Sequence, residues 1–199
     1  MKGIIPAEAD PCLGPRKPKY RRDKTVHSLR QRSKGSNMKF TGKDVIDQFN
    51  STLAAVKVSL SKIAGEGGGP PNVTGLNGWV CEQTVRKCLT QEAVAAGLKY
   101  ETVEQHKFGG RARLDLVVGN VAIEVKAHGV FGKNDCGKYE KYRTEVEKAG
   151  KKYLYVTLWE GHRPFRQMMR DIFGPENAFF VEEAGDWEKF VKAVIAGNA

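Results

Sequence analysis

The clearest pattern in the chain is a stripe of apolar residues that recurs every three or four positions between residues 41 and 64. This spacing is typical of an amphipathic helix, and Thr41 is placed to cap its first turn. The stripe consists of Val45, Phe49, Leu53, Val56, Leu60 and Ile63. Because an apolar stripe must be covered, we expect the helix to pack on the rest of the domain or on a second copy of the chain in a homodimer.

A second group of patterned segments alternates between helical and strand periodicity. Helical spacing covers residues 79–96, 137–149 and 163–173, and we expect a last helix that Asp186 caps. Strand-like runs cover residues 98–108, 113–118, 121–126, 153–159 and 178–181. The helix at 137–149 lies between two strands and so predicts a parallel crossover. The fold class that follows is α/β, with a mixed β-sheet flanked by helices.

Residues 113–118 and 121–126 are separated only by Gly119-Asn120, which is a strong signal for a β-hairpin. If Val118 faces Val121, then Asp115 lies directly opposite Glu124. Side chains alternate along a strand, so Lys126 shares their face. The other face, which we expect to be the core face, holds Leu114, Leu116, Ile123 and Val125.

Two carboxylates that face each other across a ladder repel and destabilise a sheet. A divalent cation between Asp115 and Glu124 would turn this repulsion into binding, because hard cations such as Mg²⁺ prefer carboxylate oxygens. Lys126 could then orient a water or neutralise charge on a phosphate. The alternative is a solvated face of paired surface charges, which Arg113 would join.

These residues resemble the core motif of the PD-(D/E)xK nuclease superfamily: an acid on one strand, a short turn, then Glu-x-Lys on the next. Asp115 matches the acid and Glu124-Val125-Lys126 matches the Glu-x-Lys, whereas Leu114 stands where the family often has proline. The predicted order of elements agrees with the family over residues 79–181. The resemblance implies a restriction-endonuclease-like core that uses Mg²⁺, with Mn²⁺ able to substitute.

The resemblance also implies roles for individual residues. Asp115, Glu124 and the Val125 carbonyl would hold the metal, and Lys126 would position or deprotonate the attacking water. Glu82 would aid the metal from the preceding helix, where it falls on the apolar stripe and is costly unless it is paired or metal-bound. Alternatively, Glu82 lies at the boundary between core and surface and pairs with Arg86.

The first forty residues carry most of the net charge, with eleven Lys or Arg against three Asp or Glu, or +8 of the chain's +10. Such a segment buries too little apolar surface to offset its ordering, so we expect a flexible arm that binds DNA phosphates. Its densest run contains Arg16, Lys17, Lys19, Arg21 and Arg22. A solubilising tail or a localisation signal remains the alternative.

The chain thus divides into a basic arm (residues 1–40), an amphipathic helix with a Gly- and Pro-rich connector (41–78) and a nuclease-like core (79–199). The connector lacks the Gly-Lys-Ser/Thr ending of a phosphate-binding loop, so no nucleotide cofactor is expected. No apolar run reaches the ~20 residues that cross a bilayer. The four cysteines show neither zinc nor disulfide spacing, so we expect an intracellular protein that is not membrane-bound.

Charge and motif together predict a Mg²⁺-dependent DNA endonuclease, with a type II restriction-like enzyme as first choice. A junction-resolving or repair endonuclease, which cuts by structure, is the alternative within the superfamily. A non-catalytic nucleic-acid-binding protein is the alternative outside it. Candidate phosphate contacts in the core are Lys107, Arg111, Arg113, Lys138 and Lys141.

Overall fold

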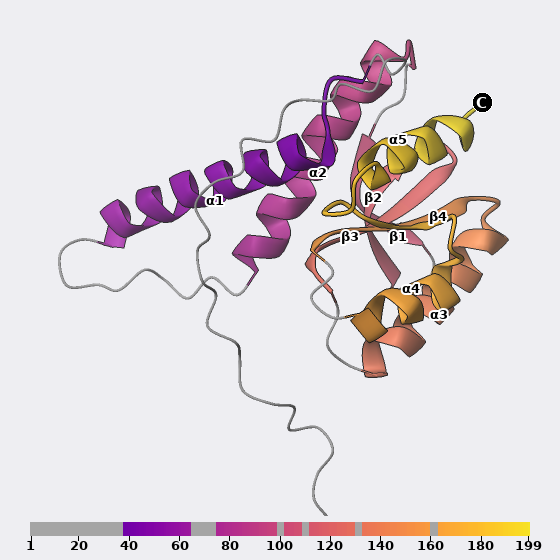
Figure 1. The fold of residues 1–199 in the computed structure, drawn as a ribbon. Coiled ribbons are helices and arrows are strands. Elements are labelled where there is room, and N and C mark those ends of the chain that lie inside the picture. Colours follow the sequence, from indigo (N-terminus) through magenta and orange to yellow (C-terminus); the bar gives the residue numbers. More distant parts are fainter. Residues whose placement is uncertain (1–37, 65–74, 99–101, 109–111, 130–132, 160–162) are drawn as a thin grey trace, which may run out of the picture. The chain divides into compact units, whose positions relative to one another are not determined.

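Helices and strands alternate along the chain in the computed structural model, which describes residues 38–64, 75–98, 102–108, 112–129, 133–159 and 163–199 (Figure 1). In chain order the elements are α1 (Gly42–Ala64), α2 (Leu76–Ala95), β1 (Thr102–Phe108), β2 (Ala112–Val118), β3 (Val121–His128), α3 (Lys133–Lys148), β4 (Lys152–Trp159), α4 (Arg163–Phe173), β5 (Ala178–Phe180) and α5 (Asp186–Ala196). The predicted basic arm and most of the predicted connector lie outside the described residues.

The strands form one mixed sheet in the order β1-β2-β3-β4-β5. The pairs β1–β2 and β2–β3 are antiparallel, whereas β3–β4 and β4–β5 are parallel. The parallel β3–β4 pair requires a crossover, which α3 supplies. The predicted α/β class and the mixed sheet flanked by helices are therefore confirmed.

The predicted hairpin is present and keeps the predicted register. Val118 pairs with Val121, and the paired segment continues to Leu116 and Ile123. Gly119 has a φ of 53°, a conformation that the first position of such a tight turn requires and that glycine adopts without strain. The turn is also tied to the rest of the domain, because the backbone N–H of Asn120 donates to Asn198 Oδ1 near the C-terminus.

Both faces of the sheet are covered, and each carries its own apolar cluster. The first cluster joins α1, α2 and α5 to Leu116, Ile123 and Val125, as predicted. The second joins α3 and α4 to the opposite face. Figure 1 shows α3 and α4 together on the side of the sheet away from α5. Leu114 belongs to this second cluster, so its predicted face is wrong. An apolar side chain is stable on either side here because α3 and α4 also exclude water from the second face.

Helix α1 packs on the domain only over its first turns. Thr41 caps the helix as predicted: its Oγ1 accepts the Asp44 N–H, and Asp44 Oδ2 accepts the Thr41 N–H in return. Val45 and Phe49 are buried, and the Phe49 ring meets the Trp159 ring edge-on. By contrast Ile63, at the far end of the predicted stripe, is 81% exposed. The core therefore covers the start of the stripe and leaves its end open.

Three local predictions need correction. Helix α2 begins at Leu76, inside the predicted connector, and Trp79 of its predicted apolar stripe is 54% exposed. Asp186 does not cap α5, because Gly185 occupies the cap position. The Asp186 carboxylate instead accepts the Phe180 N–H and pairs with Lys189, which ties α5 to the end of β5. For Asp186, the contact with the end of β5 overrode the local capping rule.

None of the helices in the described part of the chain is both long enough and apolar enough to cross a membrane.

Candidate active site

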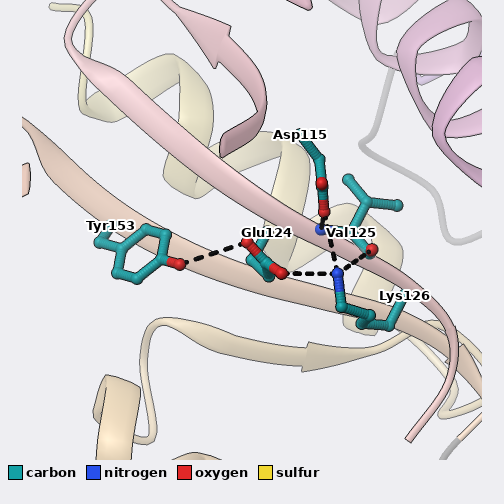
Figure 2. Close-up of polar contacts among 5 residues, drawn as sticks. All are labelled: Asp115, Glu124, Val125, Lys126 and Tyr153. Carbon is teal, nitrogen blue, oxygen red and sulfur yellow. Dashed lines mark hydrogen bonds and ion pairs between the residues drawn. The ribbon is translucent and has the colours of Figure 1, made fainter. Parts of the chain in front are cut away.

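The predicted acids meet at the open end of the hairpin, where β2, β3 and β4 lie side by side. Asp115 comes from β2, Glu124 and Lys126 come from β3, and Tyr153 comes from β4 (Figure 2). Glu124 and Lys126 are two residues apart on one strand and so share a face. The parallel register places Tyr155 beside Glu124 and Thr157 beside Lys126.

Asp115 crosses from its own strand to the next one. Among the described residues the paired register of β2 with β3 ends at Leu116 and Ile123, one step before Asp115 and Glu124, so the predicted direct pairing of these two acids is not part of the ladder. At this point Asp115 Oδ2 accepts the backbone N–H of Val125 at 2.8 Å. A side-chain oxygen thus bridges the two strands where their paired segment ends, which fixes the position of the Asp115 carboxylate.

Lys126 is the centre of the cluster. Its Nζ lies 2.5 Å from Glu124 Oε1 and donates to Asp115 Oδ2 at 3.1 Å and to the Val125 carbonyl oxygen at 3.0 Å. Three oxygen atoms from two strands therefore converge on one cation, as Figure 2 shows. The predicted repulsion between the two acids is relieved by the lysine, and their carboxylates point toward a common centre.

Burial strengthens the interactions between the charged groups of this cluster. Glu124 is only 1% exposed, and burial raises its pKa, which the adjacent Lys126 partly counteracts. Burial by itself lowers the pKa of Lys126, but the carboxylates of Glu124 and Asp115 raise it above its ordinary value. Lys126 is therefore a stable cation as long as both carboxylates face it. The alternative of a solvated charge face does not describe Glu124, which lies inside the protein.

Sequence reasoning missed the partner of the second Glu124 oxygen. The hydroxyl of Tyr153 donates to Glu124 Oε2 at 3.3 Å. The alternation of Tyr153 and Tyr155 along β4 indicates that both face one side of the sheet. The contact with Glu124 also requires that β3 lies beside β4 in the observed parallel register. No local sequence pattern encodes that pairing.

Glu82 lies half-buried on α2, next to the fully buried Cys81. Asp115 and Lys126 are near enough to Cys81 for their charges to act on the pKa of its thiol, as Glu82 does. Among the described residues no three His, Cys, Asp or Glu side chains come together as a group able to hold a metal. The convergent set is thus two carboxylates and one carbonyl, and the role of Glu82 as a further ligand stays a prediction.

The predicted phosphate contacts are only partly described. Lys138 and Lys141 are exposed on α3, and Lys138 is near enough to Glu124 to lower its pKa. The Lys138 ammonium lies 5.1 Å from the centre of the Tyr142 ring. The side chains of Lys107 and Arg113, and all of Arg111, lie outside the described residues. The predicted phosphate contacts of the arm also lie outside the described residues, namely Arg16, Lys17, Lys19, Arg21 and Arg22.

The donor set fits a hard divalent cation. Asp115 Oδ2, Glu124 Oε1 and the Val125 carbonyl are all oxygen donors, the type that Mg²⁺ and Mn²⁺ prefer. A carboxylate pair with a main-chain carbonyl leaves the remaining positions for water and substrate oxygens, which is how Mg²⁺ is commonly held. Comparison of the chain with protein-family models, with curated proteins and with solved structures gave no significant match.

Proposed function

We propose that this chain is a Mg²⁺-dependent DNA endonuclease with a restriction-endonuclease-like core. The observation that carries the proposal is the convergence of Asp115 Oδ2, Glu124 Oε1 and the Val125 carbonyl on a single cationic centre. The element order from α2 through β5 supports it, because it follows the order that the resemblance implies. The motif lysine contacts both acids, so the three motif side chains lie together.

Each residue of the cluster has a role that follows from its contacts. Asp115, Glu124 and the Val125 carbonyl would hold the ion, which supplies charge neutralisation of the phosphodiester and a lowered pKa for the attacking water. The Val125 N–H keeps Asp115 aimed at that position. Lys126 has a raised pKa and so acts as a charged donor that orients the water or a phosphate oxygen.

DNA is the substrate that the charge distribution favours. Lys138 and Lys141 are exposed on α3, on the face of the sheet that carries Glu124 and Tyr153. The basic arm would add sequence-independent phosphate contacts. A type II restriction-like enzyme is our first choice of activity, and a junction-resolving or repair endonuclease is the second.

A cleavage assay with three substrates tests the proposal. Supercoiled plasmid, linear duplex and a four-way junction are each incubated with the full chain in Mg²⁺, in Mn²⁺ and in EDTA. Discrete plasmid fragments would support a sequence-specific enzyme, and resolution of the junction alone would support a structure-specific one. We expect Asp115→Ala, Glu124→Ala and Lys126→Ala to abolish cleavage, with Asp171→Asn on the exposed side of α4 as the control. Full activity in all three alanine variants would overturn the proposal.

A non-catalytic nucleic-acid-binding protein is the second candidate, and one observation favours it. Lys126 already pairs with both carboxylates, so the cluster is also an ion-paired network without any metal. On this alternative, DNA binding is unaffected by EDTA and no product forms at any concentration of Mg²⁺ or Mn²⁺. The same assay therefore separates the two candidates.

A further inference from the structure

The carboxylate of Glu124 is held from two sides by different groups. Its Oε1 faces the Lys126 ammonium at 2.5 Å, and its Oε2 accepts the Tyr153 hydroxyl at 3.3 Å. Figure 2 shows the two contacts on opposite sides of the carboxylate. Since a free carboxylate is broad in its terminal torsion, two partners on opposite oxygens restrict its rotation. One oxygen is thereby presented to the cationic centre.

Tyr153 is itself firmly placed. It lies on β4 in the middle of the second apolar cluster, and its ring centre is 4.8 Å from that of Phe173 on α4. The register pairs Ala122 with Tyr153 and Glu124 with Tyr155, so the Tyr153 hydroxyl meets its diagonal neighbour on β3. A tyrosine in this position has a rigid ring and one polar atom, and that atom is directed at the buried acid.

The hydroxyl also stays a donor under ordinary conditions. A neutral phenol donates one hydrogen bond to an anion and adds no charge that would compete for it. Tyr153 therefore orients Glu124 without neutralising it, whereas Lys126 neutralises it.

We infer that Tyr153 is a positioning residue for the proposed metal centre: its hydroxyl orients the Glu124 carboxylate so that Oε1 is presented to the divalent cation. This inference rests on the proposed function. Removing a group that hydrogen-bonds to a metal ligand typically lowers the metal affinity about 10- to 100-fold. Tyr153 does not touch the reacting atoms, so its effect should appear first in metal binding.

The test is Mn²⁺ affinity, measured on the full chain without DNA by electron paramagnetic resonance or calorimetry. Tyr153→Phe removes one oxygen atom and leaves the ring in place. Tyr155→Phe is the matched control, because Tyr155 is a buried tyrosine of the same strand and cluster. Its hydroxyl makes no hydrogen bond of good geometry with any described residue. Glu124→Gln provides the reference for loss of a ligand, and the thermal midpoint of each variant reports on folding.

We expect Tyr153→Phe to weaken Mn²⁺ binding about 10-fold while Tyr155→Phe binds as the wild type does. Wild-type affinity in Tyr153→Phe would overturn the inference and leave the proposed function standing. An equal loss in both phenylalanine variants would also overturn it, because the effect would then come from general loosening of the aromatic cluster. If the wild-type chain itself bound no Mn²⁺ and cleaved no DNA, the proposed function would fail and the inference with it.

Discussion

Lys126 pairs with Glu124, its neighbour on the same face of β3, at 2.5 Å and holds a carboxylate that is almost completely buried. The lysine therefore occupies the centre that a metal ion would share. Two positive charges cannot occupy one place, so binding of a divalent cation must move the Lys126 ammonium away from at least part of this oxygen set. The metal-free chain is thus stabilised by the same residue that competes with the metal.

The first prediction concerns this competition. Lys126→Met removes the cation from both carboxylates and leaves Glu124 buried without its partner. We expect the free energy of unfolding in EDTA to fall by about 2 kcal/mol, less than for a fully buried pair because Lys126 is partly exposed. We also expect Mg²⁺ to raise the thermal midpoint of Lys126→Met more than that of the wild type, since no lysine competes with it.

Lys189→Met is the control for this experiment, because Lys189 also pairs with a buried carboxylate, that of Asp186. It lies on α5, away from the cluster, and should show the wild-type response to Mg²⁺. A response to Mg²⁺ in Lys126→Met no greater than in the wild type would contradict competition at this site.

A second prediction separates charge from hydrogen bonding at Asp115. Asp115→Asn keeps an oxygen that accepts the Val125 N–H and removes only the negative charge. We expect the free energy of unfolding to change by no more than about 1 kcal/mol. Cleavage should fall at least about 100-fold, because several kcal/mol of metal-derived stabilisation of the transition state depend on the charged ligand. Initial rates with saturating DNA provide the measurement, and near wild-type rates would argue against Asp115 as a ligand.

Alkaline pH provides a third test. Although burial acts to lower it, the carboxylates of Glu124 and Asp115 raise the pKa of folded Lys126 above the ordinary value of 10.5. The ion pair therefore contributes its full stability below pH 10.5 and loses it as the pH rises through the folded-state pKa. As the pH rises above 10.5, the free energy of unfolding of the wild type should decrease more steeply than that of Lys126→Met. Urea unfolding over a series of alkaline buffers measures both slopes, and parallel curves would show that Lys126 is not coupled to the acids.

The fourth prediction compares two positions on the stripe of α1. Phe49 is buried and packs edge-on against Trp159, so Phe49→Ala should cost about 3 kcal/mol or more in the free energy of unfolding. Ile63 is exposed, and Ile63→Ala should change stability by less than about 0.5 kcal/mol. Denaturant unfolding of the two variants measures the difference. A concentration-dependent loss of stability in Ile63→Ala would instead indicate that a second copy of the chain covers this end of the helix.

The last prediction concerns the basic arm. Replacing Arg16, Lys17, Lys19, Arg21 and Arg22 with glutamine should weaken DNA binding at low salt. If each contacts a phosphate, the slope of log affinity against log salt should become shallower by about 4.5. The rate of cleavage with saturating DNA should be unchanged, since these residues position the substrate and take no part in the chemistry. An unaltered salt slope would show that the arm does not contact DNA.

Several features of the site followed from local sequence rules. The Gly119-Asn120 turn determined the hairpin register, and the register brought Asp115 and Glu124 to the same end of the strand pair. The apolar period of residues 163–173 predicted α4 with its observed limits. Such features depend on neighbours within a few residues, so they can be read from a single sequence.

Other features needed contacts between distant segments. The burial of Glu124 depends on α3 and α4 covering the second face, and the bond to Tyr153 depends on the parallel pairing of β3 with β4. The role of Asp186 also depends on such a contact, because its carboxylate accepts the Phe180 N–H at the end of β5. The sequence by itself thus determined which charged groups share one strand face, because alternation and turn geometry are local. Only the tertiary structure decided how deeply they are buried and which groups surround them, because both depend on which remote surfaces pack together.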